Sequence, residues 1–414
     1  MGGDFVLPED LLIEILLWLP VVSLLRFKTV CKSWRATIES SDFIHRHATF
    51  ENSSDNLGNF IFQSRHGPFF FNFKPHFFSL SPSSRGERQW VYKHIGVPPH
   101  LAQAEVEAEA EEMSPEELPF KVKMVGSCHG IICLHEVQPR SIVLWNPATK
   151  KFRRLPKSLP LPNDPKLQFS FDYVGFGFDI ETNDYKVFQC TSFKSDSDHL
   201  KKTSVQVYSS QSNSWRWCIY DLPTFPKNTF RTNVGRYLNG SYYLFGNNFY
   251  PKQIIIDSEL FNYTDSEQVI LSFDFNKESF RMIPAPAPMP NRLHVIGGNH
   301  GKIVCVRLDY PSYIHEMYEL NDFKYRSSAT TAENNENLWS KIYTTTRVRD
   351  SDSNGPMEIT KNAVFGFVGG FPNGGLILLN LRTEEIIDIE IIDTSLEGVA
   401  LFETEVYKET LVSV

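Results

Sequence analysis

The residues from Leu7 to Ile38, LPEDLLIEILLWLPVVSLLRFKTVCKSWRATI, contain two successive patterns of helical spacing. Pro8 suits the first turn of a helix, where its missing N–H costs nothing, and the carboxylates of Glu9 and Asp10 favour the helix dipole. In the first pattern, apolar residues recur every three or four positions, at Leu11, Leu12, Ile15, Leu16 and Leu19. Pro20 ends this pattern, and the second one contains Leu24, Phe27, Cys31, Trp34 and Ile38. The stretch therefore predicts amphipathic helices at the start of the chain.

The same stretch contains more apolar residues than one face of each helix can hold. The residues outside the two patterns are Leu17, Trp18, Val21, Val22, Leu25 and Val30. A unit of about thirty residues is too small to bury all of them against itself. Either the rest of the chain covers this surplus or a partner does, and composition alone favours the rest of the chain.

The order of residues in this stretch closely resembles the F-box family, through Leu7-Pro8-Glu9-Asp10-Leu11, Leu19-Pro20, Ser23-Leu24-Leu25-Arg26-Phe27-Lys28 and Val30-Cys31-Lys32-Ser33-Trp34. The resemblance implies a three-helix F-box over residues 1–50. It also implies that this unit binds a Skp-type adaptor, which connects it to a cullin and to a ubiquitin-loading machinery. We expect the adaptor-binding residues to be Leu7, Pro8, Leu11, Ile15, Leu16, Leu19, Pro20, Leu24, Leu25, Val30, Cys31 and Trp34.

The composition limits the class of protein and its environment. A chain of 414 residues is long enough for a small domain and a large one, and its 33 Phe residues favour a β-rich body. The formal net charge of −8 argues against a nucleic-acid surface. Six cysteines in so long a chain indicate buried, reduced thiols. Because no signal-peptide pattern and no membrane-spanning run occur, we expect a cytoplasmic or nuclear protein with no membrane association.

The character of the sequence changes after Gly58. Residues 40–57 fit the end of a helix and a polar linker, and short β-branched and aromatic runs follow between Gly, Pro, Asn and Asp clusters. Pairs of apolar residues seven positions apart then bracket polar turns, at Trp145/Phe152, Phe178/Tyr185, Tyr208/Trp215, Phe273/Phe280, Tyr318/Tyr325 and Leu379/Ile386. This arrangement predicts a series of β-hairpins.

The hairpins recur at intervals of roughly 45 to 65 residues, the size of a four-stranded propeller blade with loop insertions. Strand spacing alone leaves a β-sandwich as the alternative. The expected fold class is therefore α+β multidomain, with the helical unit followed by a mostly antiparallel, all-β domain that forms a β-propeller of about six blades. Residues 51–119 are assigned to a linker, the first blade strands and an acidic insertion, and residues 120–414 to the β domain, whose propeller includes strands from 58–95.

Closure of the ring requires a late strand to join an early one, because closure hides sheet edges that would otherwise aggregate. We expect a strand near Val399–Phe402 or Tyr407–Val414 to complete a blade that begins near Asn59–Phe62.

The β region also resembles the plant F-box-associated, kelch-like domain. The resemblance rests on Gly126 to Leu134, Leu144-Trp145-Asn146-Pro147-Ala148-Thr149, Gly175 to Asp179, Asn183 to Val187, Val207-Tyr208 with Ser214-Trp215-Arg216, Phe273-Asp274 with Phe280, and Tyr407 to Ser413. One departure is Leu244, where Trp is common in that family. In order and length the chain is also similar to the S-locus F-box proteins of flowering plants, whose targets in self-incompatibility are basic ribonucleases of the pistil.

Three motifs have the outline of a chemical site. The segment from Gly126 to Gly130 has the outline of a nucleophile elbow around Cys128, but a strand pattern and not a helix follows it. Cys128, His129, Cys133 and His135 lack the second ligand pair of a zinc site, which favours buried thiols. The glycine-rich stretch from Gly366 to Gly375 lacks the Lys and Ser/Thr of a phosphate-binding loop and fits a loop that enters a strand. We predict no catalytic residue, no metal and no cofactor.

Residues 101–118 contain seven Glu and no basic residue. They fit a solvated loop, or an acidic contact for a basic target formed by Glu105, Glu107, Glu109, Glu111 and Glu112.

The two resemblances together imply a substrate-recognition subunit of a Skp–cullin–F-box ubiquitin ligase, which brings a protein target to the ligase for degradation and makes no bond itself. The alternatives are a propeller enzyme and a scaffold that binds the adaptor without ubiquitin transfer.

Overall fold

The computed structural model describes most of the helical unit and the strands of the β region. The described residues are 8–50, 60–66, 75–82, 89–99, 101, 122–136, 141–160, 167–195, 198–218, 235–256, 259–286, 293–299, 302–309, 314–321, 338–345, 358–359, 363–368, 375–380, 383, 385–391 and 399–414. The chain divides into two compact units, and each is described by itself. The first contains residues 1–155, 391–400 and 404–414, and the second contains residues 156–390 and 401–403.

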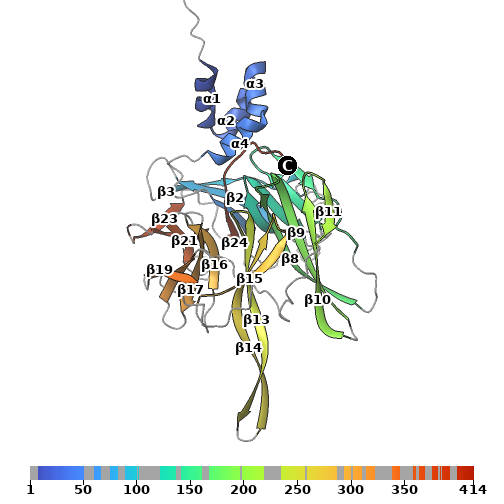
Figure 1. Ribbon diagram of the computed structural model, residues 1–414. Coiled ribbons are helices and arrows are strands. Elements are labelled where there is room, and N and C mark those ends of the chain that lie inside the picture. Colours follow the sequence, from blue (N-terminus) through green and yellow to red (C-terminus); the bar gives the residue numbers. More distant parts are fainter. Residues whose placement is uncertain are drawn as a thin grey trace, which may run out of the picture. The chain divides into compact units, whose positions relative to one another are not determined.

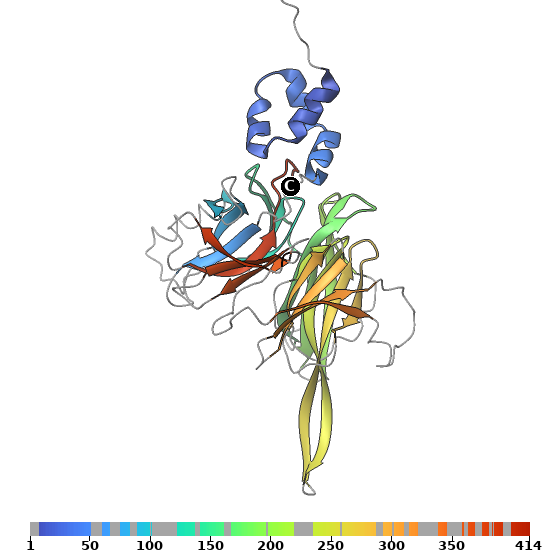
Figure 2. The same ribbon diagram turned by 90° about the vertical axis from the view of Figure 1, so that its left-hand side faces the viewer.

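The first unit begins with four helices, α1 Glu9–Leu17, α2 Val21–Phe27, α3 Lys32–Glu39 and α4 Ser41–Thr49 (Figures 1 and 2). Pro8 and Pro20 cap the first two helices, as their lack of an N–H favours. The Cys31 thiol and the Ser40 hydroxyl cap the other two by accepting hydrogen bonds from backbone N–H groups. The predicted helices are confirmed, but the second pattern is split at residues 28–31, so that the unit has four helices and not three.

The strands of the first unit are β1 Phe60–His66, β2 Pro75–Pro82, β3 Gln89–His94, β4 Val122–Cys128, β5 Ile131–Glu136, β6 Ser141–Asn146, β7 Lys151–Arg154 and most of β24 Val399–Val406. They form one sheet in the order β4-β5-β6-β7 and a second run in the order β3-β2-β1-β24. Strand β24 is therefore the neighbour of β1, which supports the expected pairing of an early and a late strand. The alternative strand at Tyr407–Val414 was wrong, because these residues follow β24 without forming a strand.

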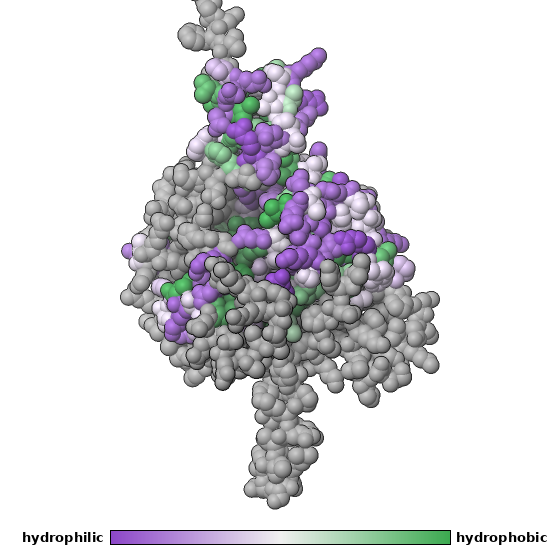
Figure 3. Space-filling model, viewed as in Figure 1, coloured by the Kyte–Doolittle hydropathy of each residue, from purple (hydrophilic) through white to green (hydrophobic). Residues whose placement is uncertain are grey.

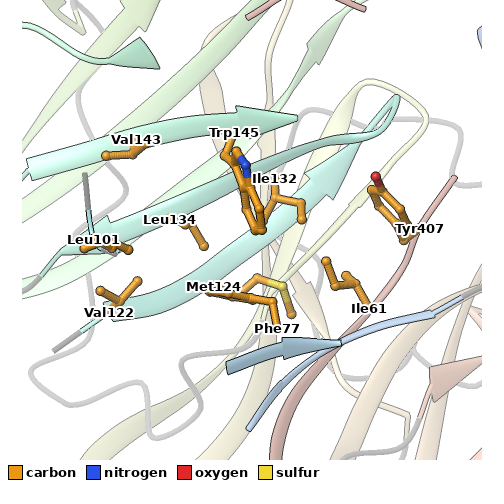
Figure 4. Packing of buried hydrophobic residues seen from close by; sticks show 10 residues of the cluster. All are labelled: Ile61, Phe77, Leu101, Val122, Met124, Ile132, Leu134, Val143, Trp145 and Tyr407. Carbon is orange, nitrogen blue, oxygen red and sulfur yellow. The ribbon is translucent and has the colours of Figure 1, made fainter. Parts of the chain in front are cut away.

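A buried cluster joins the strands of the first unit (Figure 4). Trp145 and Ile132 from the β4–β7 sheet pack with Phe77 and Ile61 from β2 and β1, and Tyr407 closes the cluster. The rings of Phe77 and Trp145 meet edge to face with their centroids 5.4 Å apart.

The strands of the second unit are β8 Leu167–Asp179, β9 Asp184–Ser195, β10 Asp198–Ser209, β11 Ser214–Trp217, β12 Arg236–Leu238, β13 Ser241–Ile256, β14 Glu259–Asp274, β15 Ser279–Pro284, β16 Leu293–Asn299, β17 Lys302–Asp309, β18 Ile314–Leu320, β19 Trp339–Thr345, β20 Glu358–Ile359, β21 Ala363–Val368, β22 Gly375–Asn380 and nearly all of β23 Ile386–Ile391. They form antiparallel four-stranded groups: β8 to β11, β12 to β15, β16 to β19 and β20 to β23. The all-β propeller architecture is thus confirmed, and the five sheets formed by the described strands of the chain agree roughly with the expected count of about six blades.

The seven-residue spacing marks cross-strand partners. Trp145 faces Phe152, and the pairs Phe178/Tyr185, Tyr208/Trp215, Phe273/Phe280 and Leu379/Ile386 also stand opposite one another. The sixth expected pair was wrong, because Tyr318 faces Lys341 across β18 and β19, and Tyr325 lies outside the described residues.

A shared turn geometry explains the spacing. The side-chain Oδ1 atoms of Asn146, Asp179 and Asp274 each accept hydrogen bonds from the backbone N–H groups two and three residues further on. Four positions after each of these residues, the backbone turns into the left-handed region, with φ of 57°, 54° and 51° at Lys150, Asn183 and Glu278. The same turn repeated in both units fixes the apolar pairs at one distance along the chain.

Candidate protein-binding site on the helices

Large apolar side chains are exposed on the helical unit. Among them are Leu11, Ile15, Trp18, Val22 and Val30, whose exposed fractions range from 40% to 60%. Leu11, Ile15 and Trp18 follow one another at helical spacing on α1 and its C-cap, Val22 lies on α2, and Val30 lies between α2 and α3. Hydrophobic surface is visible among the polar side chains of this unit in Figure 3. We call these five residues the apolar stripe.

The opposite side of the same helices is already filled. Leu16 and Leu24 are completely buried, and they pack with Val21, Ile38 and Phe43 in the core of the helical unit. Leu16 and Leu24 were expected to contact an adaptor directly, but here their side chains fill this core and expose no surface. They support the apolar stripe from beneath. Leu17 and Val21 from the apolar surplus noted in the sequence are thus covered by the chain itself, whereas Trp18, Val22 and Val30 remain exposed.

The other expected contact residues differ in their exposure to solvent. Pro8, Pro20 and Cys31 are exposed, and Leu19, Leu25 and Trp34 are partly buried. Leu7 lies outside the described residues. The expected set omitted the exposed residues Trp18 and Val22, although the spacing of Trp18 from Leu11 and Ile15 indicates a common face of α1.

Two contacts hold the stripe in place. The Trp18 ring meets Phe50 edge to face with a centroid distance of 4.9 Å, which orients the indole although more than half of it is exposed. Arg46 on α4 reaches Glu14 on α1, with an Nη2–Oε1 distance of 2.6 Å. Because both charged side chains are largely exposed, the ion pair adds at most about 1 kcal/mol of stability.

The cysteines differ in environment. Cys128, Cys133, Cys190 and Cys305 are buried as expected, whereas Cys31 at the start of α3 is exposed, which corrects the expectation for that residue. The Ser33 hydroxyl and the Trp34 backbone N–H lower the pKa of the Cys31 thiol by hydrogen bonding to its sulfur. Burial raises the pKa of the Cys133 thiol, which makes that sulfur a poor nucleophile.

The described residues show neither a nucleophile elbow at Cys128 nor a metal-binding cluster. Strand β5 follows the turn after Cys128, so the strand–turn–helix geometry of a nucleophile elbow is absent from this described segment. In the described part of the chain, no group of three or more His, Cys, Asp or Glu residues is placed to hold a metal ion. None of the described helices has both the length and the apolar character that a membrane span requires. The five expected target-binding residues, Glu105 to Glu112, lie outside the described residues.

A four-helix unit with an exposed apolar stripe, joined to four-stranded antiparallel groups, defines an F-box protein with a β-propeller. Comparison with known families agrees: residues 5–46 match the F-box domain, and residues 93–367 match the F-box associated beta propeller domain. The chain belongs to this F-box associated beta propeller family.

Two relatives come from Arabidopsis thaliana. The F-box/kelch-repeat protein At3g23880 is 27% identical over 285 residues, which cover 68% of this chain and 65% of that protein. The F-box protein At3g07870 is 24% identical over 313 residues, covering 69% of this chain and 61% of that protein. The chain thus matches less than two thirds of the length of either relative. Among solved structures, TolB from Acinetobacter baumannii aligns with 88% of this chain over 70% of the TolB chain. The sequence identity is 10% and the TM-score is 0.45, so the two folds are only distantly similar.

Proposed function

We propose that this protein is the substrate-recognition subunit of a Skp–cullin–F-box ubiquitin ligase, acting in the cytoplasm or nucleus. In this proposal the apolar stripe binds a Skp-type adaptor, and the β domain binds a protein target. The protein makes no bond itself. It raises the effective concentration of target lysines at the ubiquitin-loaded enzyme, which is the contribution that proximity makes to catalysis.

The observation that supports the proposal is the apolar stripe on a helical unit whose opposite face is full. Burying one such side chain is worth about 1.5–3 kcal/mol, so leaving several in water is costly unless a partner covers them. A few well-buried residues provide most of the binding energy in protein interfaces, and Trp, which the stripe contributes as Trp18, is enriched among them. The F-box match over residues 5–46 indicates the partner, a Skp-type adaptor.

Titration of a purified Skp-type adaptor into the full-length protein tests the proposal. The double variant Ile15→Asp with Val22→Asp places two charges on the stripe, and we expect it to weaken adaptor binding at least tenfold, or about 1.4 kcal/mol. The control is Asp42→Ala on α4, because Asp42 is exposed and polar. Unchanged affinity in a folded double variant would overturn the assignment of the stripe.

The target itself is a further part of the proposal. The acidic insertion supports a basic target, and similarity to S-locus F-box proteins suggests ribonucleases of the pistil as one such class. A scaffold that binds the adaptor without ubiquitin transfer is the second candidate. In-cell ubiquitination of proteins that co-purify with the β domain separates the two: the ligase proposal expects modified lysines on the captured protein, and the scaffold expects none.

A further inference from the structure

Residues Tyr407–Val414, here called the strap, leave β24 and adopt neither strand nor helix. An irregular segment of this kind normally lies on the surface. In contrast, Tyr407, Thr410 and Leu411 are at most 5% exposed. A segment without regular structure is buried only when its backbone polar groups find partners, and the strap finds them in the β4–β7 sheet.

On the side of the sheet, Asn146 and His129 hold the strap. The Asn146 Nδ2 group donates hydrogen bonds to the carbonyl oxygens of Thr410 and Val412, at 3.0 and 2.8 Å. The Thr410 hydroxyl donates a hydrogen bond of 2.6 Å to the carbonyl oxygen of His129 in the β4–β5 turn. Asn146 is completely buried, and its side chain therefore serves the turn through Oδ1 and the strap through Nδ2 at once.

On the side of the helices, the strap enters the core. Leu411 belongs to the same buried cluster as Leu16 and Leu24, and Ala148 in the β6–β7 turn packs against that cluster. The Lys408 ammonium donates a hydrogen bond to the carbonyl oxygen of Phe50, the C-cap residue of α4. Neighbouring residues of the strap thus contact the sheet and the helices.

The fit at the sheet is close. Gly130 has a φ of +74°, and a Cβ atom built there would lie 2.5 Å from the Lys408 carbonyl oxygen and 2.6 Å from the Thr410 hydroxyl. Glycine at this position therefore both permits the left-handed turn and leaves room for the strap.

We propose that the strap is a positioning element, which fixes the orientation of the four helices relative to the β4–β7 sheet. If the proposed function holds, on which this consequence rests, the strap sets how the adaptor-bound helices are oriented toward the sheet that begins the target-binding domain. Asn146, Thr410 and Leu411 are its positioning residues. They touch neither adaptor nor target in this proposal and act through the geometry that they hold.

The sequence supplies a matched substitution. Asp179 and Asp274 occupy the same turn position as Asn146 and accept the same backbone hydrogen bonds with a carboxylate. Asn146→Asp therefore keeps the turn but removes both donors to the strap and places a carboxylate against two carbonyl oxygens. Leu411→Ala removes the contact with the helical core instead. Asp274→Asn is the control, because it changes an equivalent turn that has no hydrogen bond to the strap in the described residues.

Pulsed electron paramagnetic resonance on the full-length protein measures the effect. Spin labels are attached at Asp42→Cys on α4 and Lys151→Cys on β7, both exposed, in a background with Cys31→Ser and Cys218→Ser that leaves only buried thiols among the described cysteines. We expect one narrow distance distribution in the parent and in Asp274→Asn. The distribution should broaden at least twofold in both Asn146→Asp and Leu411→Ala, and the thermal unfolding of the β domain should persist in each.

The outcomes are distinct. A distribution that stays narrow in Leu411→Ala and in a folded Asn146→Asp would overturn the strap proposal. If Asn146→Asp does not fold, Leu411→Ala and Gly130→Ala decide by the same criterion. Adaptor affinity, measured separately, should change less than twofold in the strap variants. If the parent protein does not bind the adaptor, the proposed function is overturned, while the measured distance distributions still test the strap proposal.

Discussion

The Lys186 ammonium lies 2.7 Å from a carboxylate oxygen of Asp179, and both side chains are almost completely buried. The same ammonium donates hydrogen bonds to Glu278 at 2.9 Å and to the Phe275 carbonyl oxygen at 3.0 Å. Burial alone would lower the pKa of Lys186, but the hydrogen bonds to Asp179 and Glu278 outweigh it and raise the pKa. This cation therefore ties the turn after β8 to the turn after β14 within the second unit.

Removing this cation should destabilise the second unit strongly. Lys186→Met leaves the buried Asp179 carboxylate without its cation, while Glu278 keeps its ion pair with Arg216. Breaking a buried pair in this way costs about 3–5 kcal/mol. The control is Lys341→Met, because Lys341 pairs with Glu316 at 3.1 Å while half exposed, and such a pair is worth at most about 1 kcal/mol. Urea unfolding monitored by tryptophan fluorescence measures the free energy of unfolding of both variants. Equal midpoints would contradict a structural role for the buried cluster.

Core and surface residues of the helical unit should respond differently. Leu24→Ala opens a cavity in the core and should cost about 2–5 kcal/mol of folding stability, with little effect on adaptor affinity once folded. Ile15→Ala removes an exposed contact and should show the reverse: stability nearly unchanged and adaptor binding weakened. Chemical denaturation combined with adaptor titration checks both properties of each variant, and a loss of affinity confined to Leu24→Ala would contradict this division.

Protonation of His47 at low pH should lower the folding stability of the helical unit. Its ring is buried, its Nε2 donates to the Leu19 carbonyl oxygen at 3.0 Å, and Lys408 is nearby. Burial is the main cause that lowers the pKa of His47, and the positive charge of Lys408 lowers it further against the opposing effect of the Leu19 carbonyl. The unfolded chain takes up this proton near pH 6.5 and the folded chain only at lower pH. The stabilising contribution is therefore full above about pH 6.5 and is lost as pH falls through the folded pKa.

His129 should also make the folding stability fall as the pH is lowered. Burial chiefly lowers its pKa, with smaller contributions from His45 and Lys408. Urea unfolding of the parent at pH 7.5 and 5.0 should show a clear loss of stability, and His47→Phe should reduce that loss. A parent midpoint independent of pH over this range would show that neither ring must be neutral for the unit to fold.

The acidic insertion should act on the association rate. Changing Glu105, Glu107, Glu109, Glu111 and Glu112 to Gln preserves size and helix propensity but removes the charge. If the insertion attracts a basic target, association should slow more than dissociation quickens, and binding by the parent should weaken as salt rises. Stopped-flow or surface measurements with an identified target test this. Rates equal to those of the parent at every salt concentration would leave the insertion as a solvated loop.

The sequence predicted the hairpins well and the burial of the helical residues only in part. Trp145 and Phe152 were predictable as partners because an Asn-headed turn between them has a fixed length. Tyr318 is followed by Glu319 and not by Asn or Asp, and it faces Lys341 instead. On α1 and α2 both faces are apolar, so spacing alone could not tell the buried Leu24 from the exposed Val22. The strap has no periodicity in its sequence, so spacing could not predict that Leu411 joins the helical core.

The pairing of β24 with β1 has a consequence for biosynthesis. Strand β24 emerges from the ribosome about 330 residues after β1, which at about 5–20 residues per second is a delay on the order of tens of seconds. During that delay the edge of β1 that pairs with β24 is unpaired, and the core of the helices lacks Leu411. A nascent chain terminated before β24 would expose both surfaces to chaperones and proteases, so messages with stop codons before β24 should yield little protein.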